Sequence, residues 1–549
     1  MALTKVSNNM FGAFALNAEG YNGANAGEKI AAAIDDLPLA GGVIDARSFT
    51  GTQTFGSDIF ASRSKPFVLM LGNAIYEIDM STYSLSLNSH QKIEMYGTTF
   101  QPDVDGTTAT SAGQGFITPE IFQTTGTATS GSSTMTLAST TNLEVGCIIA
   151  LDGGQGTFGS DTSSTLSSGI SDSDTSIPLS DASYFSAVPY TIIIGSEIIT
   201  GTTKVGNSLT GVTRGAYGTT AVSHSSSDPV TFSNYWRGIV ESISGSTITL
   251  SGNVTTSVTN ARVLFGSTNI SITGTGVFNG RQNRAGADPS ANVYGIYFNY
   301  ASSCHVGDDI TFKNWDHGGI ALVSSWYNYV GGSYFGNGRP SDSLGGNIWL
   351  FRSSSFNVIN PQRITDSWGG IFIDDRTGTL NLADGSCNKN TINCSFINTE
   401  STCLGLSGVS QNVAYLGSMS SNNDCVDMTT NPQSATPRNC NKNTVFAGHA
   451  SGNVSARDSH EENYIEIGSS NNSPVMSGST SYISIKRGTA AGEYFGTGTG
   501  VKTNAVVLID GVTAPSTVAG LAQIYVDTSD GDLKIKFGDG TVKTISTDT

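Results

Sequence analysis

Carboxylates gather in one stretch of a chain that is otherwise poor in charge. Asp374 and Asp375 directly follow the apolar run at 371–373, while Asp316 and Asp366 each lie four or five residues before such a run. Glycoside hydrolysis requires one carboxylic acid and one carboxylate on either side of a sugar linkage. Two carboxyl groups a few ångströms apart raise the pKa of one of them, which then stays protonated as the acid. The sequence therefore predicts a catalytic set of Asp374, Asp375, Asp366 and Asp316.

Four of the five tryptophans lie in the same stretch. Aromatic rings held at a surface suit the apolar faces of sugars, and Arg352 beside Asp375 would keep that carboxylate ionised. The predicted substrate-binding residues are Trp349, Trp326, Trp368, Trp315, Arg352, Arg376 and Tyr327. The alternative is that the rings pack beneath a loop or against another subunit, and that aspartate–arginine pairs only stabilise turns.

Other chemistries have weaker support in the sequence. A polysaccharide lyase needs a base near a cation that neutralises a uronate, and the candidates are His317, Lys313, Arg352 and Arg376, with Tyr327 as the acid. The sequence has no G-x-S-x-G elbow, phosphate loop or dinucleotide fingerprint, so we expect no cofactor. Aspartates 527, 530, 532 and 539 fit hairpin turns better than an EF-hand calcium loop, and we expect no metal.

Composition excludes several classes of protein. Only 13% of the 549 residues are charged, against about 25% in an ordinary domain, and the net charge is −17. Nucleic-acid binding needs a basic surface, and a membrane span needs a run of about 18 apolar residues that this sequence lacks. The seven cysteines include no C-x-x-C pair, so we expect neither a disulfide framework nor a zinc site.

Short apolar triplets recur along the second half of the chain. They begin at Ile296, Ile320, Ile348, Ile371 and Leu404, with spacings of 24, 28, 23 and 33 residues. About 23 residues is one coil of three short strands, and stacked coils place equivalent residues about 4.8 Å apart. Asparagines and serines at the turns would then form ladders along the stack, which accounts for the low charge.

This register predicts which side chains face outward. Trp349 is the middle residue of its triplet and should point away from the core. Asp374 aligns with Phe351 and Asn299, and Asp375 with Arg352 and Tyr300. The carboxylates should therefore collect around the aromatic residues.

Two segments resemble a known family. Residues 22–44 look like the capping helix and first coil of pectate-lyase-like right-handed β-helices, and residues 270–280 resemble a coil of polygalacturonase-type members. The Asp374–Asp375 pair is similar to the paired aspartates of polygalacturonases. The neighbouring coils depart from that pattern: Phe351–Arg352 replaces Asn-Thr-Asp, and Leu406-Ser-Gly replaces Gly-His-Gly. The family is common in bacteriophage tailspikes.

The resemblance implies an all-β, right-handed parallel β-helix with added segments. The expected divisions are an N-terminal virion-attachment peptide (1–19), a capping helix with the first coils (20–123), an inserted β domain (124–260) with an inner module (about 162–232), the main β-helix (261–480), and a C-terminal β segment for trimerisation or capping (481–549). The insertion is expected to be nested, one β unit within another.

The expected function is that of a phage tailspike which binds a bacterial surface polysaccharide (capsule, exopolysaccharide or O-antigen) and hydrolyses it. The alternatives are a polysaccharide lyase on the same fold and a receptor-binding tail fibre without enzymatic activity. Expected partners are two further copies in a homotrimer and a phage tail or adaptor protein. The expected location is the virion tail, with synthesis in the host cytoplasm and action at the host surface.

Overall fold

A computed structural model describes most of the chain. It covers residues 6–8, 13–103, 115–155, 164–182, 190–216, 219–232, 234–281, 293–338, 346–351, 353–374, 387–429, 440, 442–456, 463–470, 475–476, 482–485, 492–495, 514–517 and 522–547. The part up to Gly498 forms one compact unit, and Thr499–Thr549 form a second. The two units are described separately.

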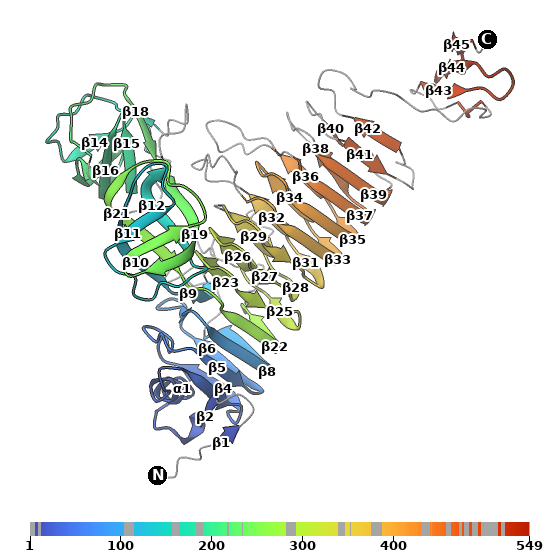
Figure 1. Cartoon of the computed structure of the whole chain (residues 1–549). Helices are drawn as coiled ribbons and strands as arrows, with labels where there is room; N and C mark the ends of the chain where they lie inside the picture. Colours follow the sequence, from blue (N-terminus) through green and yellow to red (C-terminus); the bar gives the residue numbers. More distant parts are fainter. Residues whose placement is uncertain are drawn as a thin grey trace. The chain divides into compact units, whose positions relative to one another are not determined.

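The first unit is a stack of coils, each made of two or three strands (Figure 1). In one coil, strands β24 (His305–Val306) and β25 (Ile310–Lys313) lie in sheet A, and β26 (Gly318–Val323) lies in sheet B. The next coil, of β27 (Tyr329–Val330), β28 (Ser333–Phe335) and β29 (Ile348–Phe351), pairs with it strand for strand in parallel. The predicted all-β parallel β-helix is confirmed.

Sheet B supplies one strand per coil. Its strands are β7 (Leu85–Leu87), β9 (Gly115–Pro119), β23 (Tyr294–Asn299), β26, β29 (Ile348–Phe351), β32 (Ile371–Asp374), β34 (Leu404–Ser407), β36 (Asp424–Thr429), β38 (Asn453–Ala456) and β40 (Val475–Met476).

Sheet A supplies the other strands of the coils. They are β1 (Val6–Asn8), β2 (Ala13–Asn17), β3 (Gly42–Ala46), β4 (Gly51–Phe55), β5 (Phe67–Leu71), β6 (Ala74–Ile78), β8 (Gln91–Pro102), β22 (Ser271–Asn279), β24, β25, β27 (Tyr329–Val330), β28 (Ser333–Phe335), β30 (Val358–Ile359), β31 (Arg363–Ser367), β33 (Thr391–Thr399), β35 (Val413–Ser421), β37 (Thr444–Ala450), β39 (Tyr464–Ser470), β41 (Tyr482–Ile485) and β42 (Gly492–Phe495). Strand β41 extends the sheet beyond residue 480, so the β-helix continues past the predicted boundary.

The interior repeats similar side chains from coil to coil. The rings of Phe278, Phe312 and Tyr334 are fully buried and stack with centroids 5.1 Å apart. Aliphatic residues occupy the facing positions of sheet B, where Ile296, Ile320 and the first residues of the later triplets are fully buried. A coil repeat of about 4.8 Å is a favourable stacking distance for aromatic rings.

An asparagine ladder runs along one turn of the stack. Six asparagines take part: Asn328, Asn357, Asn390, Asn412, Asn443 and Asn463. The side-chain oxygen of Asn390 accepts the backbone N–H of Asn357 at 3.0 Å, and the side-chain amide of Asn390 donates to the Ser354 carbonyl at 3.0 Å. All six are buried, and each satisfies backbone groups of the adjacent coils. The sequence prediction of turn ladders is confirmed.

Helix α1 (Ala26–Asp35) packs at the N-terminal end of the stack. Asn25 caps it by accepting the Glu28 backbone N–H at 2.9 Å, and Glu28 accepts the Ala24 N–H at 2.7 Å. Ile30 and Ile34 are fully buried against the first strands. The predicted helix therefore covers otherwise unpaired coil surface.

Two β units are inserted between coils. The outer one is a closed barrel of β10 (Ile121–Ala128), β11 (Thr134–Leu137), β12 (Ile148–Gln155), β19 (Asn234–Ser244), β20 (Thr247–Leu250) and β21 (Val258–Gly266). The inner one is a sheet of β13 (Ser164–Thr165), β14 (Ser176–Pro178), β15 (Tyr190–Ile194), β16 (Glu197–Val205), β17 (Ser208–Thr213) and β18 (Pro229–Phe232). The inner sheet lies between β12 and β19 in the sequence, so the insertion is nested.

The inner sheet holds a buried carboxylate. Glu197 is fully buried and pairs with both arms of the Arg214 guanidinium at 2.8 Å, and its second oxygen lies 2.8 Å from His224 Nε2. Burial alone would raise the pKa of Glu197, but Arg214, backbone N–H groups and His224 outweigh it and lower the pKa to about 2.

The second unit contains a three-stranded antiparallel sheet of β43 (Gln523–Val526), β44 (Leu533–Lys536) and β45 (Val542–Ser546). Asp527 accepts hydrogen bonds from Ser529, and Asp539 accepts the Thr541 N–H at 2.8 Å. These aspartates therefore stabilise hairpin turns. Across the described residues, no helix has the length and apolar character needed to cross a membrane.

The ladder predicts a measurable cost for losing one amide. Asn390→Ala removes the acceptor of the Asn357 N–H and the donor to the Ser354 carbonyl, leaving buried polar groups unsatisfied. We expect the free energy of unfolding to fall by about 3 kcal/mol in denaturant titration. The exposed Asn422→Ala serves as the control and should change it little. Equal effects of the two changes would contradict the ladder's role.

The buried carboxylate predicts acid sensitivity. Because the pKa of Glu197 is lowered from 4.5 to about 2, its contribution to stability is present above pH 4.5 and is lost as the pH falls toward 2. The loss is roughly 3 kcal/mol. Thermal unfolding between pH 6 and pH 2 should show this loss for the wild type and a flatter profile for Glu197→Gln, with the exposed Glu241→Gln as control. An unchanged profile in Glu197→Gln would contradict it.

Candidate functional site

The predicted register of the apolar triplets is confirmed. Ile296 pairs with Ile320, Ile320 with Ile348, Ile348 with Ile371, and Ile371 with Leu404. Outward positions therefore form columns along sheet B. One column contains Tyr297, Ala321, Trp349, Phe372, Gly405 and Asp427, and the next contains Asn299, Val323, Phe351, Asp374 and Ser407. These two columns are called the sheet-B face.

Aromatic rings cover the middle of the sheet-B face. Trp349 and Phe372 stack with centroids 5.0 Å apart, and His317 lies 5.5 Å from Trp349. Glycines make room for the rings, because a Cβ on Gly346 would lie 2.3 Å from Phe372 and one on Gly405 would lie 2.6 Å from it. The cluster is apolar on its flanks, where it packs on Ala321 and Val323.

Two carboxylates follow the rings. Asp374 is buried, whereas Asp427 is half-buried. Cys440 is fully buried, and its thiol donates to the Leu406 carbonyl at 3.2 Å. Burial raises the pKa of the Cys440 thiol to about 12, and the charges of Asp427 and Asp374 add to the increase. The charges of both carboxylates therefore act on the same buried thiol.

Asp316 and Asp366 do not join this pair. Asp374 pairs with Phe351, which in turn pairs with Val323. Asp374 therefore lies at the C-terminal end of the sheet-B strands. Asp316 precedes β26, whose length alone is about 16 Å, and is buried beside His317. Asp366 lies on β31 in sheet A, exposed and with a left-handed φ of 53°. Neither Asp316 nor Asp366 therefore lies with Asp374, because Asp316 is at the opposite end of the sheet-B strands and Asp366 is in sheet A.

Three predicted residues, Asp375, Arg352 and Arg376, lie outside the described residues. Their assignments as catalytic and substrate-binding residues stay predictions.

The tryptophans are less exposed than the sequence suggests. Trp315 is 1% exposed, and its indole N–H donates to the Phe278 carbonyl in the core. Trp349 is 5% exposed. Trp326 is half-buried and packs against Ile148 and neighbouring barrel residues. Trp368 is half-buried in the turn before β32. The expectation of four surface rings is therefore wrong for Trp315 and Trp349.

Tyr327 is the exposed member of the predicted set. Its ring is 52% exposed and stacks on Phe356, with centroids 5.0 Å apart. The Lys389 ammonium lies 5.2 Å from the centroid of the same phenylalanine ring. Tyr327 follows β26 and so lies at the end of sheet B where Asp374 is found.

The residues considered for a lyase are spread over the coil. His317 precedes β26 and Tyr327 follows it, so the base and acid lie at opposite ends of one strand. Lys313 ends β25 in sheet A. The structure does not bring His317 or Lys313 to Tyr327. Arg352 and Arg376 lie outside the described residues, so the lyase assignment stays a prediction.

Phe372 and Asp427 were missed in the sequence. Val426-Asp-Met428 repeats the apolar–outward–apolar pattern of Leu404-Gly-Leu406 one coil later. Extending the triplet alignment by one coil would have placed Asp427 on the sheet-B face.

Burial changes the expected effect of altering Trp349. Trp349→Ala should lower the free energy of unfolding by about 3 kcal/mol, because it leaves a cavity among packed rings. The half-buried Trp368 provides the comparison, and Trp368→Ala should lower the free energy of unfolding by a smaller amount. Thermal and denaturant unfolding measure both. A Trp349→Ala protein as stable as the wild type would show that this ring is not part of the packing.

Comparisons with known proteins give distant structural matches. No protein-family model and no curated protein matches the sequence significantly. Three solved tailspikes match in structure. Gp54 of Acinetobacter baumannii bacteriophage AP22, solved with A. baumannii capsular saccharide, has 11% identity over 76% of this chain and 72% of its own, with a TM-score of 0.28.

The other two are from Pseudomonas phages. The gp61 tailspike of phage phi297 has 11% identity over 78% of this chain and 66% of its own, with a TM-score of 0.29. The gp49 tailspike of phage LKA1 has 12% identity over 76% of this chain and 67% of its own, with a TM-score of 0.27. Likenesses this distant assign neither a ligand nor an activity to the chain.

Proposed function

We propose that this chain is a phage tailspike that binds a bacterial surface polysaccharide over the sheet-B face and hydrolyses it. The observation that carries the proposal is the placement of Asp374 and Asp427 on one outer face, directly beyond the Trp349–Phe372 stack. The half-buried Phe372 ring offers the accessible part of this stack, aromatic faces bind sugar rings, and a pair of carboxyl groups supplies the acid and base of hydrolysis.

Strand geometry sets the spacing of the pair. Two coils and two residues along the strand separate the Cα atoms by roughly 12 Å. Aspartate side chains that lean toward each other would bring the carboxyl groups to about 6.5–9.5 Å, the separation found in inverting enzymes. We therefore propose inversion at the anomeric carbon, with Asp375 as a further candidate beside Asp374.

The proposed setting is the virion tail, with three copies of the chain joined in a homotrimer. A tail or adaptor protein would hold the trimer on the virion. The capped parallel β-helix supports this setting, because it offers long outer faces on which an extended polysaccharide can lie.

A receptor-binding tail fibre without catalysis is the second candidate. The burial of Asp374 and Trp349, 3% and 5% exposed, favours it, because a catalytic carboxylate must reach its substrate. On this alternative the polysaccharide is held and not shortened.

Substitutions of the carboxylates test the proposal. Asp374→Asn and Asp427→Asn should each lower cleavage of purified host capsule, exopolysaccharide or O-antigen by at least about 100-fold, since general acid–base catalysis contributes at least that much. Binding of the polysaccharide and the melting temperature should stay near wild type. Asp366→Asn, on strand β31 of sheet A, is the matched control and should cleave normally.

The product distinguishes the candidate functions. New reducing ends without an unsaturated uronate, released first as the inverted anomer, would support hydrolysis. An unsaturated uronate chromophore would indicate a lyase. Binding with no shortening would indicate a receptor-binding fibre, and normal cleavage by both aspartate variants would move the active site elsewhere.

A further inference from the structure

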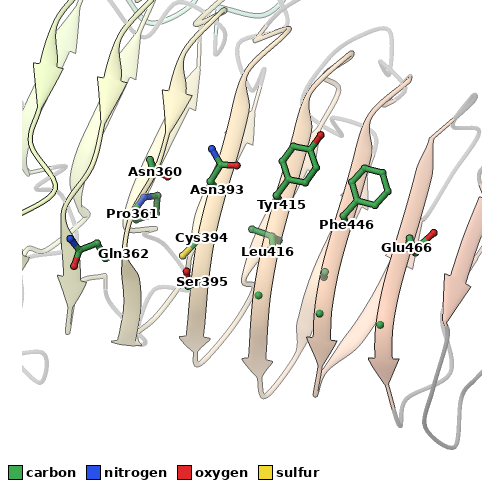
Figure 2. A pocket seen from close by; sticks show the side chains of 14 residues that line it. Asn360, Pro361, Gln362, Asn393, Cys394, Ser395, Tyr415, Leu416, Phe446 and Glu466 are labelled. Atoms are coloured by element: carbon green, nitrogen blue, oxygen red, sulfur yellow. The ribbon is translucent and has the colours of Figure 1, made fainter.

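A groove of about 610 Å³ lies on the outer face of sheet A (Figure 2). It crosses strands β33, β35, β37 and β39. Residues 360–362 of the preceding coil also line it, so four coil spacings make it roughly 19 Å long. None of the residues considered above lines it.

Two parallel rings form one wall of the groove. Tyr415 and Phe446 pair across β35 and β37, their centroids lie 5.4 Å apart, and their planes differ by 10°. Tyr415 is 51% exposed, and Phe446 is half-buried. Figure 2 shows the two rings side by side on the strands. Unlike Trp349, they offer apolar ring surface that a ligand can reach.

Glycines form the floor beside the rings. A Cβ on Gly417 would lie 2.2 Å from the Ser395 carbonyl oxygen, and one on Gly468 would lie 2.5 Å from the Gly448 carbonyl oxygen. Close approach of consecutive strands therefore excludes larger residues here. The strip without side chains is what makes this part of the sheet concave.

Polar groups flank the rings at both ends. Asn393 precedes Tyr415 in the column, and Glu466 follows Phe446. Glu466 accepts a hydrogen bond from the Tyr464 hydroxyl at 2.6 Å. The amides of Asn360 and Gln362 also line the groove. Amides and carboxylates hydrogen-bond sugar hydroxyl and acetamido groups.

The charges of the residues that line the groove determine which glycans fit it. Glu466 is the single charged residue among the fourteen that line it, and none is a lysine or arginine. A uronate would meet a negative carboxylate with no cation to balance it. Neutral hexoses and N-acetylated amino sugars fit this lining.

We propose that the sheet-A groove is a second saccharide-binding site, for neutral or N-acetylated hexose chains, separate from the sheet-B face. It rests on the proposed function only in that the same polysaccharide would occupy both. A second copy of the chain is the other occupant to consider. The glycine hollow and the flanking amides favour a sugar, because a subunit contact would be expected to present a flatter and more apolar surface.

Isothermal titration calorimetry of the full chain tests this with three probes: maltohexaose, chitohexaose and hexagalacturonate. We expect at least one neutral hexamer to bind, and hexagalacturonate to bind about tenfold more weakly or not at all. Tyr415→Ala and Phe446→Ala should each weaken the neutral hexamer about tenfold, since one aromatic contact contributes on the order of 1 kcal/mol.

Tyr96→Ala is the matched control. Tyr96 is also exposed on sheet A, at 45%, and donates to Glu94 as Tyr464 does to Glu466. This variant should bind as the wild type does, and melting temperatures should show that all variants are folded.

The outcomes separate this proposal from the previous one. Loss of neutral-hexamer binding in Tyr415→Ala, with binding retained in Asp374→Asn, supports the groove whether or not the chain cleaves polysaccharide. No binding of either neutral hexamer, or binding that Tyr415→Ala and Phe446→Ala leave unchanged, overturns it. A change of oligomeric state in Tyr415→Ala, measured by light scattering, would instead identify the groove as a subunit contact and also overturns it.

Discussion

The buried asparagine ladder is the constraint on which the coil register depends. Each side chain along it satisfies backbone groups of the neighbouring coils, as Asn390 does for Asn357 and Ser354. A slip of one residue in any of the coils between Asn328 and Asn463 would leave several buried amide and carbonyl groups without partners, at a cost of about 1–3 kcal/mol each. The ladder therefore fixes which residues of each coil face inward and which form the outer columns.

With the register fixed from inside, the outer faces are available for function. The outer faces of the two sheets carry different side chains. Sheet B carries a packed ring stack, Trp349 with Phe372, followed by Asp374 and Asp427. Sheet A carries exposed rings over a glycine floor. One repeating interior thus supports a mostly buried arrangement of rings and carboxylates on one sheet and an open, ring-lined hollow on the other.

The sequence predicts the coils well because their signal is local. Apolar triplets such as those at Ile320 and Ile348 reveal the register directly. Exposure of the rings is not local: Trp315 is covered by core aromatics such as Phe116, and Trp326 by barrel residues. Whether two aspartates lie close together also depends on strand length. Asp316 precedes a sheet-B strand and Asp374 ends one, so at least the length of a strand separates them.

A structure of the protein with a bound oligosaccharide from its host polysaccharide tests the account most directly. The account predicts sugar rings on the outer columns, with a glycosidic linkage between Asp374 and Asp427 and further sugar rings against Tyr415 in sheet A. Sugar bound only to the inserted barrel or the C-terminal sheet, with both outer faces empty, would contradict it.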